Sequence, residues 1–142
     1  MEHLNFEKVN ELGIAESHEE FKTSLNAQFI GETAEVGLYL AMARVAQRQG
    51  YPEAAEVLKV IAWEEAEHAA QYAELIGKVS DCTKTNISQM IKGEVGSNKL
   101  KSQLAQKAKD ANLEEVYTFI DHAARDEARH ANMLNGLLDR LN

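Results

Sequence analysis

The sequence has 142 residues, a net charge of −8 and a single cysteine, Cys82. A chain of this length is expected to form one domain over residues 1–142, with a core of its own. The negative charge argues against nucleic acid or an anionic membrane as a partner, because both attract basic faces. One cysteine excludes an intrachain disulfide and, within this sequence, an iron centre held by four thiolates.

The expected location is the cytoplasm. The first eight residues lack the basic and apolar regions of a signal peptide. No apolar run approaches the length of a membrane span, so no membrane partner is expected. The low cysteine count suits a reducing compartment.

The first part of the chain predicts a short extension followed by a long helix. Residues 1–16 form an amphipathic N-terminal extension that ends near Gly13. A helix is then predicted over about 18–49. Ser17 and Glu20 match the spacing of a capping box, which places Ser17 at the N-cap.

Three further helices follow, because helical periodicity continues and few breakers interrupt it. They are predicted over about 52–77, about 83–109 and about 113–140. Gly77 is expected to stop the second helix, and Asn112 to cap the start of the fourth. No β-alternation competes with this pattern, so the fold class is all-α, with four helices.

An acidic motif occurs twice in the chain. Glu32 is followed by Glu65-x-x-His68, and Glu94 is followed, at the same separation, by Glu127-x-x-His130. Each position of the first copy therefore has an equivalent in the second copy, at the same distance along the sequence as Glu94 lies from Glu32. Identical pairs at this interval include Gly31/Gly93, Glu32/Glu94, Leu38/Leu100, Ala62/Ala124, Glu65/Glu127, His68/His130, Ala69/Ala131 and Leu75/Leu137.

In each predicted helix, a glutamate interrupts the apolar face that should be buried. A buried carboxylate without a partner is costly, and a shared cation removes that cost. Glu and His at i, i+3 point the same way on a helix, and two such pairs with two further Glu residues form the ligand set of a dimetal site. A solvated face or a relic that has lost its metals are the alternatives. The predicted ligands of the symmetric set are Glu32, Glu65, His68, Glu94, Glu127 and His130.

Glu35 breaks the repeat, because Ser97 stands at the equivalent position of the second copy. Glu35 lies three residues after Glu32 on the same helix face, so it is predicted as a seventh ligand that makes the two metals unequal. The alternative is a carboxylate outside the ligand set or on the surface. Tyr39, two helical turns after Glu32, also faces the site, either for catalysis or as core packing.

From Leu25 to Leu141 the chain resembles the rubrerythrin family of ferritin-like diiron proteins. The Glu-x-x-Glu motif of Glu32 and Glu35 lies in the first half of the domain, as in reverse rubrerythrins. The resemblance implies a ferritin-like four-helix bundle and reduction of hydrogen peroxide to water at a non-haem diiron centre. The matching segments are Phe29–Met42, Gly50–Glu53, Glu64–Ala70 and Asp126–His130.

The resemblance also implies how the ligands divide between the two irons. Glu65 and Glu127 would bridge them. Glu32 and His68 would bind one iron, and Glu94 the other.

At the second iron, the resemblance implies that Glu35 and His130 exchange as the oxidation state changes. The catalytic candidates are therefore Glu35, His130 and Tyr39. The expected cofactor is a pair of iron ions, and manganese or zinc can substitute at oxygen and imidazole ligands.

Two functions remain open. The first is a peroxidase in oxidative-stress defence, with hydrogen peroxide as substrate and an external electron donor, for which rubredoxin is expected. The second is a ferroxidase-like iron-binding protein without a dedicated reductase. The lack of a rubredoxin domain in this sequence favours the second, and Glu35 favours the first. A purely structural bundle is a third, weaker reading.

A homodimer is expected, with helices exchanged between chains. In the ferritin-like arrangement the second and third helices run parallel. The second helix is about 39 Å long, whereas residues 78–83 reach only about 20 Å. The connection could instead lead into a second bundle. The alternative is a monomeric up-down-up-down bundle, in which short loops are normal.

Overall fold

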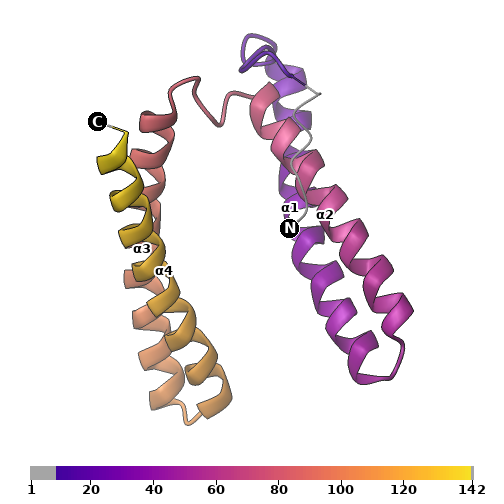
Figure 1. Ribbon diagram of the computed structural model, residues 1–142, viewed down its shortest axis with the longest axis vertical. Helices are drawn as coiled ribbons and strands as arrows, with labels where there is room; N and C mark the ends of the chain where they lie inside the picture. The colour runs from indigo at the N-terminus through magenta and orange to yellow at the C-terminus, as the bar shows by residue number, and fades with distance from the viewer. Residues whose placement is uncertain (1–8, 142) are drawn as a thin grey trace. The chain divides into compact units, whose positions relative to one another are not determined.

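A computed structural model describes residues 9–141, which contain four α-helices and no strand (Figure 1). The predicted all-α class is confirmed. Residues 1–8 of the expected N-terminal extension lie outside the described residues. No helix in the described range is long and apolar enough to cross a membrane. The helices are α1 (Glu19–Arg48), α2 (Pro52–Leu75), α3 (Thr83–Asp110) and α4 (Glu114–Arg140).

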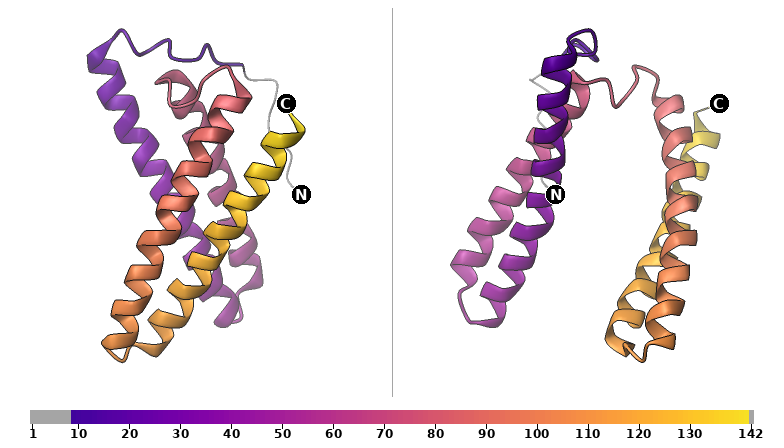
Figure 2. Two further views of the ribbon diagram at one scale, coloured as in Figure 1. Left: turned by 90° about the vertical axis from the view of Figure 1, so that its left-hand side faces the viewer. Right: turned by 180° about the vertical axis from the view of Figure 1, so that it is seen from behind.

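The helices form two hairpins. α1 packs against α2 and α3 packs against α4, as the views in Figure 2 show. The chain divides between Val79 and Ser80 into two compact units, each with one hairpin. That residues 1–142 act as one domain stays a prediction.

Alanine side chains fill the contacts inside the hairpins. Ala43 and Ala46 of α1 are buried with Ala55 of α2, and Leu58 packs against this cluster. Small side chains let the two helix backbones approach closely. In the second hairpin the buried positions are Ile87, Ala105, Ala108, Ala124 and Ala131.

Helices α1 and α2 both end at a glycine in the left-handed conformation. Gly50 has φ 83° and Gly77 has φ 68°, values that glycine adopts at little cost. The N–H of the next residue donates back to the helix: Tyr51 to the carbonyl of Ala46, at 2.9 Å, and Lys78 to that of Ala73, at 2.9 Å. These Schellman motifs confirm Gly77 as the stop, although α2 itself ends at Leu75.

The capping box predicted at Ser17 is wrong. α1 begins at Glu19 with His18 at the N-cap, and no side chain caps the helix. The Ser17 hydroxyl lies 3.1 Å from His18 Nδ1 instead. Glu19 and Glu20 in the first turn suit the positive end of the helix dipole.

The prediction that Asn112 caps the fourth helix is also wrong. This residue ends α3 rather than capping α4, whose N-cap is Leu113. Asn112 has φ 57°, a conformation that asparagine tolerates better than most residues. The Leu113 N–H donates to the Ala108 carbonyl at 2.9 Å, so α3 ends in the same Schellman geometry as the first two helices.

A turn of the N-terminal segment is fastened to the end of α2. The Gly13 N–H donates to the Glu74 carbonyl at 2.8 Å, and the Ala15 N–H to the Leu75 carbonyl at 3.0 Å. Asn10 Nδ2 donates to the Glu74 carboxylate at 2.7 Å. The last carbonyls of a helix lack partners within it, and this turn supplies two.

Candidate metal centre

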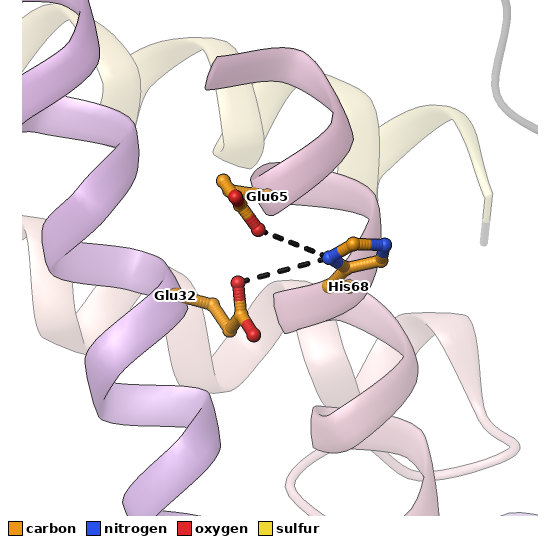
Figure 3. Close-up of side chains that lie close together, drawn as sticks. All are labelled: Glu32, Glu65 and His68. Carbon is orange, nitrogen blue, oxygen red and sulfur yellow. Dashed lines mark hydrogen bonds and ion pairs between the residues drawn. The ribbon is translucent and has the colours of Figure 1, made fainter. Parts of the chain in front are cut away.

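The first hairpin brings together two glutamates and a histidine. Glu32 lies on α1, and Glu65 and His68 lie three residues apart on α2 (Figure 3). His68 Nδ1 is 3.0 Å from Glu65 Oε2 and 3.7 Å from Glu32 Oε2. One ligand atom from each residue lies within 4.8 Å of the others, so the group can hold one cation.

The second hairpin contains the repeat of this group. Glu94 lies on α3, and Glu127 and His130 lie on α4. Their ligand atoms also lie within 4.8 Å of one another, and His130 Nδ1 is 3.4 Å from Glu94 Oε2. The structure therefore brings six of the seven predicted ligands together as two groups of three.

The carboxylates of both groups are largely buried. Each of the four glutamate side chains is 17% exposed. Glu94 Oε2 is fully buried and has no hydrogen-bond partner among the described residues. A buried carboxylate oxygen without a donor is costly, and a cation would satisfy it. Oxygen and imidazole ligands suit iron, manganese and zinc, so each group fits one such ion.

In the first hairpin the pKa values of Glu32 and Glu65 shift in opposite directions. A hydrogen bond with Glu65, burial and the neighbouring negative charge raise the pKa of Glu32 above its ordinary value. The hydrogen bonds from Glu32 and His68 lower the pKa of Glu65. A bound metal ion would favour the deprotonated form of both side chains, because carboxylate ligands bind metals in that form.

Lys101 on α3 contacts Glu127, a contact that the sequence analysis missed. Its Nζ lies 2.5 Å from Glu127 Oε1 and donates to Ser97 Oγ at 2.8 Å. The hydrogen bonds from Lys101 and Glu94 lower the pKa of Glu127 below its ordinary value. One signal could have revealed this residue, since Lys101 stands at the position of the second copy that is equivalent to Tyr39 in the first.

Glu35 and Tyr39 are not members of the first group. Glu35 is exposed, and Tyr39 is half-buried on the same helix as Glu32. After the Glu65 hydrogen bond and burial, the charge of Glu35 adds to the causes that raise the pKa of Glu32. Their catalytic and ligand roles stay predictions.

A hollow of about 340 Å³ lies next to the first group. Gln71 and Tyr72 on α2 line it together with Glu32, His68 and Leu75. This volume exceeds what a molecule of a few atoms needs. The polar residues on its wall can donate and accept hydrogen bonds to such a molecule.

Comparison with known proteins identifies the family. The model of the rubrerythrin family matches residues 24–95 of this chain, from α1 into α3. Reverse rubrerythrin-1 of Clostridium acetobutylicum is 45% identical over 133 residues, which cover 92% of this chain and 74% of that protein. The chain belongs to the rubrerythrin family. Its ferritin-like fold class is thereby confirmed.

A second relative is similar along nearly its full length. An uncharacterized protein of Methanocaldococcus jannaschii is 50% identical over 139 residues, which cover 96% of this chain and 98% of that protein.

Proposed function

We propose that this rubrerythrin binds two iron ions and reduces hydrogen peroxide to water in the cytoplasm, as a defence against oxidative stress. The observation that carries the proposal is the Glu-Glu-His group that occurs twice, with the same separation in sequence between its two glutamates. All four carboxylates are largely buried. One buried carboxylate oxygen without a donor supports it further. Similarity to a reverse rubrerythrin fits the same function.

Each ligand has a proposed role. Glu65 and Glu127 would be shared between the two ions. Glu32 and His68 would bind one ion, and Glu94 would bind the other. Manganese or zinc can occupy the same ligands, because all of them are oxygen or imidazole donors.

The reduction of one peroxide consumes two electrons and two protons and yields two water molecules. A ferrous pair held by these ligands would supply both electrons at one place, which would allow O–O cleavage without release of a hydroxyl radical. The hollow beside His68 would admit the substrate, with Gln71 and Tyr72 holding it by hydrogen bonds. Glu35, whose charge acts on Glu32, is exposed and is the proposed route for protons from solvent.

Glu35 and His130 are the proposed exchangeable ligands. The exchange would let the second ion change its ligand when it changes its charge. An anionic carboxylate favours the ferric state, whereas a neutral imidazole suits the ferrous state. Tyr39 on the same face as Glu32 is the proposed hydrogen-bonding partner of the reacting groups.

The test is anaerobic reconstitution with ferrous iron, followed by metal analysis and rapid mixing. We expect two ions per pair of Glu-Glu-His groups, fast oxidation by hydrogen peroxide and slow oxidation by oxygen. Glu94→Ala should lower the iron content, whereas Glu64→Ala, on an exposed position of α2, should not. One ion or none in the unchanged protein would contradict the proposal.

One observation favours the second candidate function, a ferroxidase-like iron-binding protein. The sequence has one cysteine, so it cannot hold a four-thiolate iron centre to relay electrons. A peroxidase would then take its electrons from a donor outside these 142 residues, and rubredoxin is the proposed one. Oxidation of the loaded protein by oxygen at least as fast as by peroxide would favour the ferroxidase.

We also propose that the protein acts as a homodimer in which each bundle combines hairpins of two chains. Each hairpin exposes large apolar side chains, among them Leu38, Leu100 and Phe119 at 62%, 68% and 71%. A second hairpin would cover such side chains. Residues 76–82 reach at most about 25 Å, shorter than the roughly 36 Å of α2 that a parallel return within one bundle must span.

A further inference from the structure

Lys101 forms an ion pair with a predicted metal ligand. Its Nζ lies 2.5 Å from Glu127 Oε1 and 2.8 Å from Ser97 Oγ. The Lys101 side chain is 35% exposed and that of Glu127 is 17% exposed, so the pair is partly shielded from water. Lys101 comes from α3 and Glu127 from α4, so the pair links the two helices of the second hairpin.

The first hairpin has no counterpart of this lysine. Tyr39 stands at the position equivalent to Lys101, and Glu35 at the position equivalent to Ser97. Glu65, the counterpart of Glu127, is instead 3.0 Å from His68 Nδ1. The second group therefore carries a fixed positive charge on its carboxylate, whereas the first does not.

We propose that Lys101 is a built-in counter-cation of the second group, and that it makes the two metal ions bind in order. In the metal-free protein its ammonium group neutralises Glu127. A metal ion that needs Glu127 Oε1 must displace it, because two cations at one carboxylate oxygen repel each other. Glu127 is the proposed shared ligand of both ions, so the ion that binds at its Oε1 binds after the other ion and more weakly. This inference rests on the proposed dimetal centre.

The opposing effects of one substitution test the proposal. Lys101→Met removes the charge but keeps a long apolar side chain. Without metal, this variant should melt at a lower temperature, because Glu127 then lies beside Glu94 without a counter-charge. In anaerobic titration with Co²⁺, followed by visible absorption and calorimetry, the second ion should bind about fivefold more tightly than in the unchanged protein.

A structural defect would lower both the melting temperature and the affinity for the second ion. A lower melting temperature together with a higher affinity is therefore expected only if the metal ion displaces Lys101. Lys99→Met is the matched control, since Lys99 is exposed two residues away on α3. It should change neither quantity. Ser97→Ala removes one hydrogen-bond acceptor of Lys101 and keeps the ion pair. It should raise the affinity for the second Co²⁺ ion, as Lys101→Met does, but by a smaller factor.

Unchanged or weaker binding of the second ion in Lys101→Met would overturn the proposal. If that variant does not fold, Ser97→Ala decides, and an unchanged second affinity there would overturn it as well. These results differ from a failure of the dimetal assignment, in which the unchanged protein itself would bind fewer than two Co²⁺ ions.

Discussion

Single residues make the two Glu-Glu-His groups unequal. Glu35 in the first hairpin corresponds to Ser97 in the second, and Tyr39 corresponds to Lys101. The first group thus has an additional carboxylate beside it, whereas the second has an additional ammonium. An ion near the first group would meet more negative charge than an ion near the second.

Glu35→Ala should lower peroxide turnover roughly tenfold or more while the iron content changes little. The six residues of the two groups still hold the ions, but the exchange with His130 is lost. The measurement pairs turnover with metal analysis on the same samples. Glu64→Ala serves as the control for removal of an exposed carboxylate.

Equal losses of iron and turnover in Glu35→Ala would show that Glu35 only helps to hold the metal. Unchanged turnover would mean that the asymmetry between Glu35 and Ser97 plays no part in the reaction.

Glu32→Gln should stabilise the metal-free protein at neutral pH. The hydrogen bond with Glu65 and burial raise the pKa of Glu32, so folding favours its protonated form. Its contribution to stability is present below the unfolded pKa of about 4.3 and is lost as pH rises through the folded pKa. Glutamine stays neutral, so the variant should unfold at higher urea concentration than wild type at pH 7.

This advantage of Glu32→Gln should shrink as the pH falls below about 4, because Glu32 then becomes protonated in the unfolded state as well. Urea unfolding of both metal-free proteins across this range checks the sign. A variant that is less stable than wild type at pH 7 would contradict the raised pKa of Glu32.

Among the elements, the helices themselves could be predicted from the sequence. Their apolar positions recur at helical spacing, and Gly50, Gly77 and Pro52 mark the ends. The structure agrees within about two residues, the usual uncertainty of helix ends. Periodicity is a local property of the sequence, so no knowledge of packing was needed.

The helix caps could not be predicted in the same way. Ser17 has the residue type of an N-cap but contacts His18, and Asn112 takes the left-handed conformation that ends α3. Both residue types serve at either end of a helix or in turns. The local sequence does not say which backbone conformation the neighbouring turn imposes.

The candidate site shows the same division. Glu65 and His68 are three residues apart on one helix, so their shared direction follows from helix geometry. Lys101 reaches Glu127 across two helices, and this contact depends on how α3 and α4 pack. The only sign of this contact in the sequence is that Lys101 stands where the first copy of the repeat has Tyr39.

At the scale of the whole molecule, the proposed exchange of hairpins predicts complementation between two inactive variants. Glu65→Ala damages the first hairpin and Glu127→Ala the second. When both chains are unfolded and refolded together, a mixed dimer with exchanged hairpins contains one bundle from the two undamaged halves. Iron binding and peroxide turnover should return to about a quarter of the wild-type level, because half of randomly mixed dimers are mixed and each has one intact site of two.

Refolding each variant alone provides the control and should give no recovery. Mixing without unfolding tests whether the chains exchange freely. If the refolded mixture stays inactive while the wild-type protein recovers under the same treatment, each bundle is built from a single chain and the exchange is wrong.

The turn that fastens residues 10–15 to the end of α2 has a consequence for the hollow beside His68. Helix ends normally fray, and their amide hydrogens exchange with water early. Here the carbonyls of Glu74 and Leu75 are held by Gly13 and Ala15. Leu75 also forms part of the wall of the hollow. Residues 10–15, which contribute no metal ligand, should therefore slow the fraying of this wall. Deleting them should loosen the hollow without changing its polar residues.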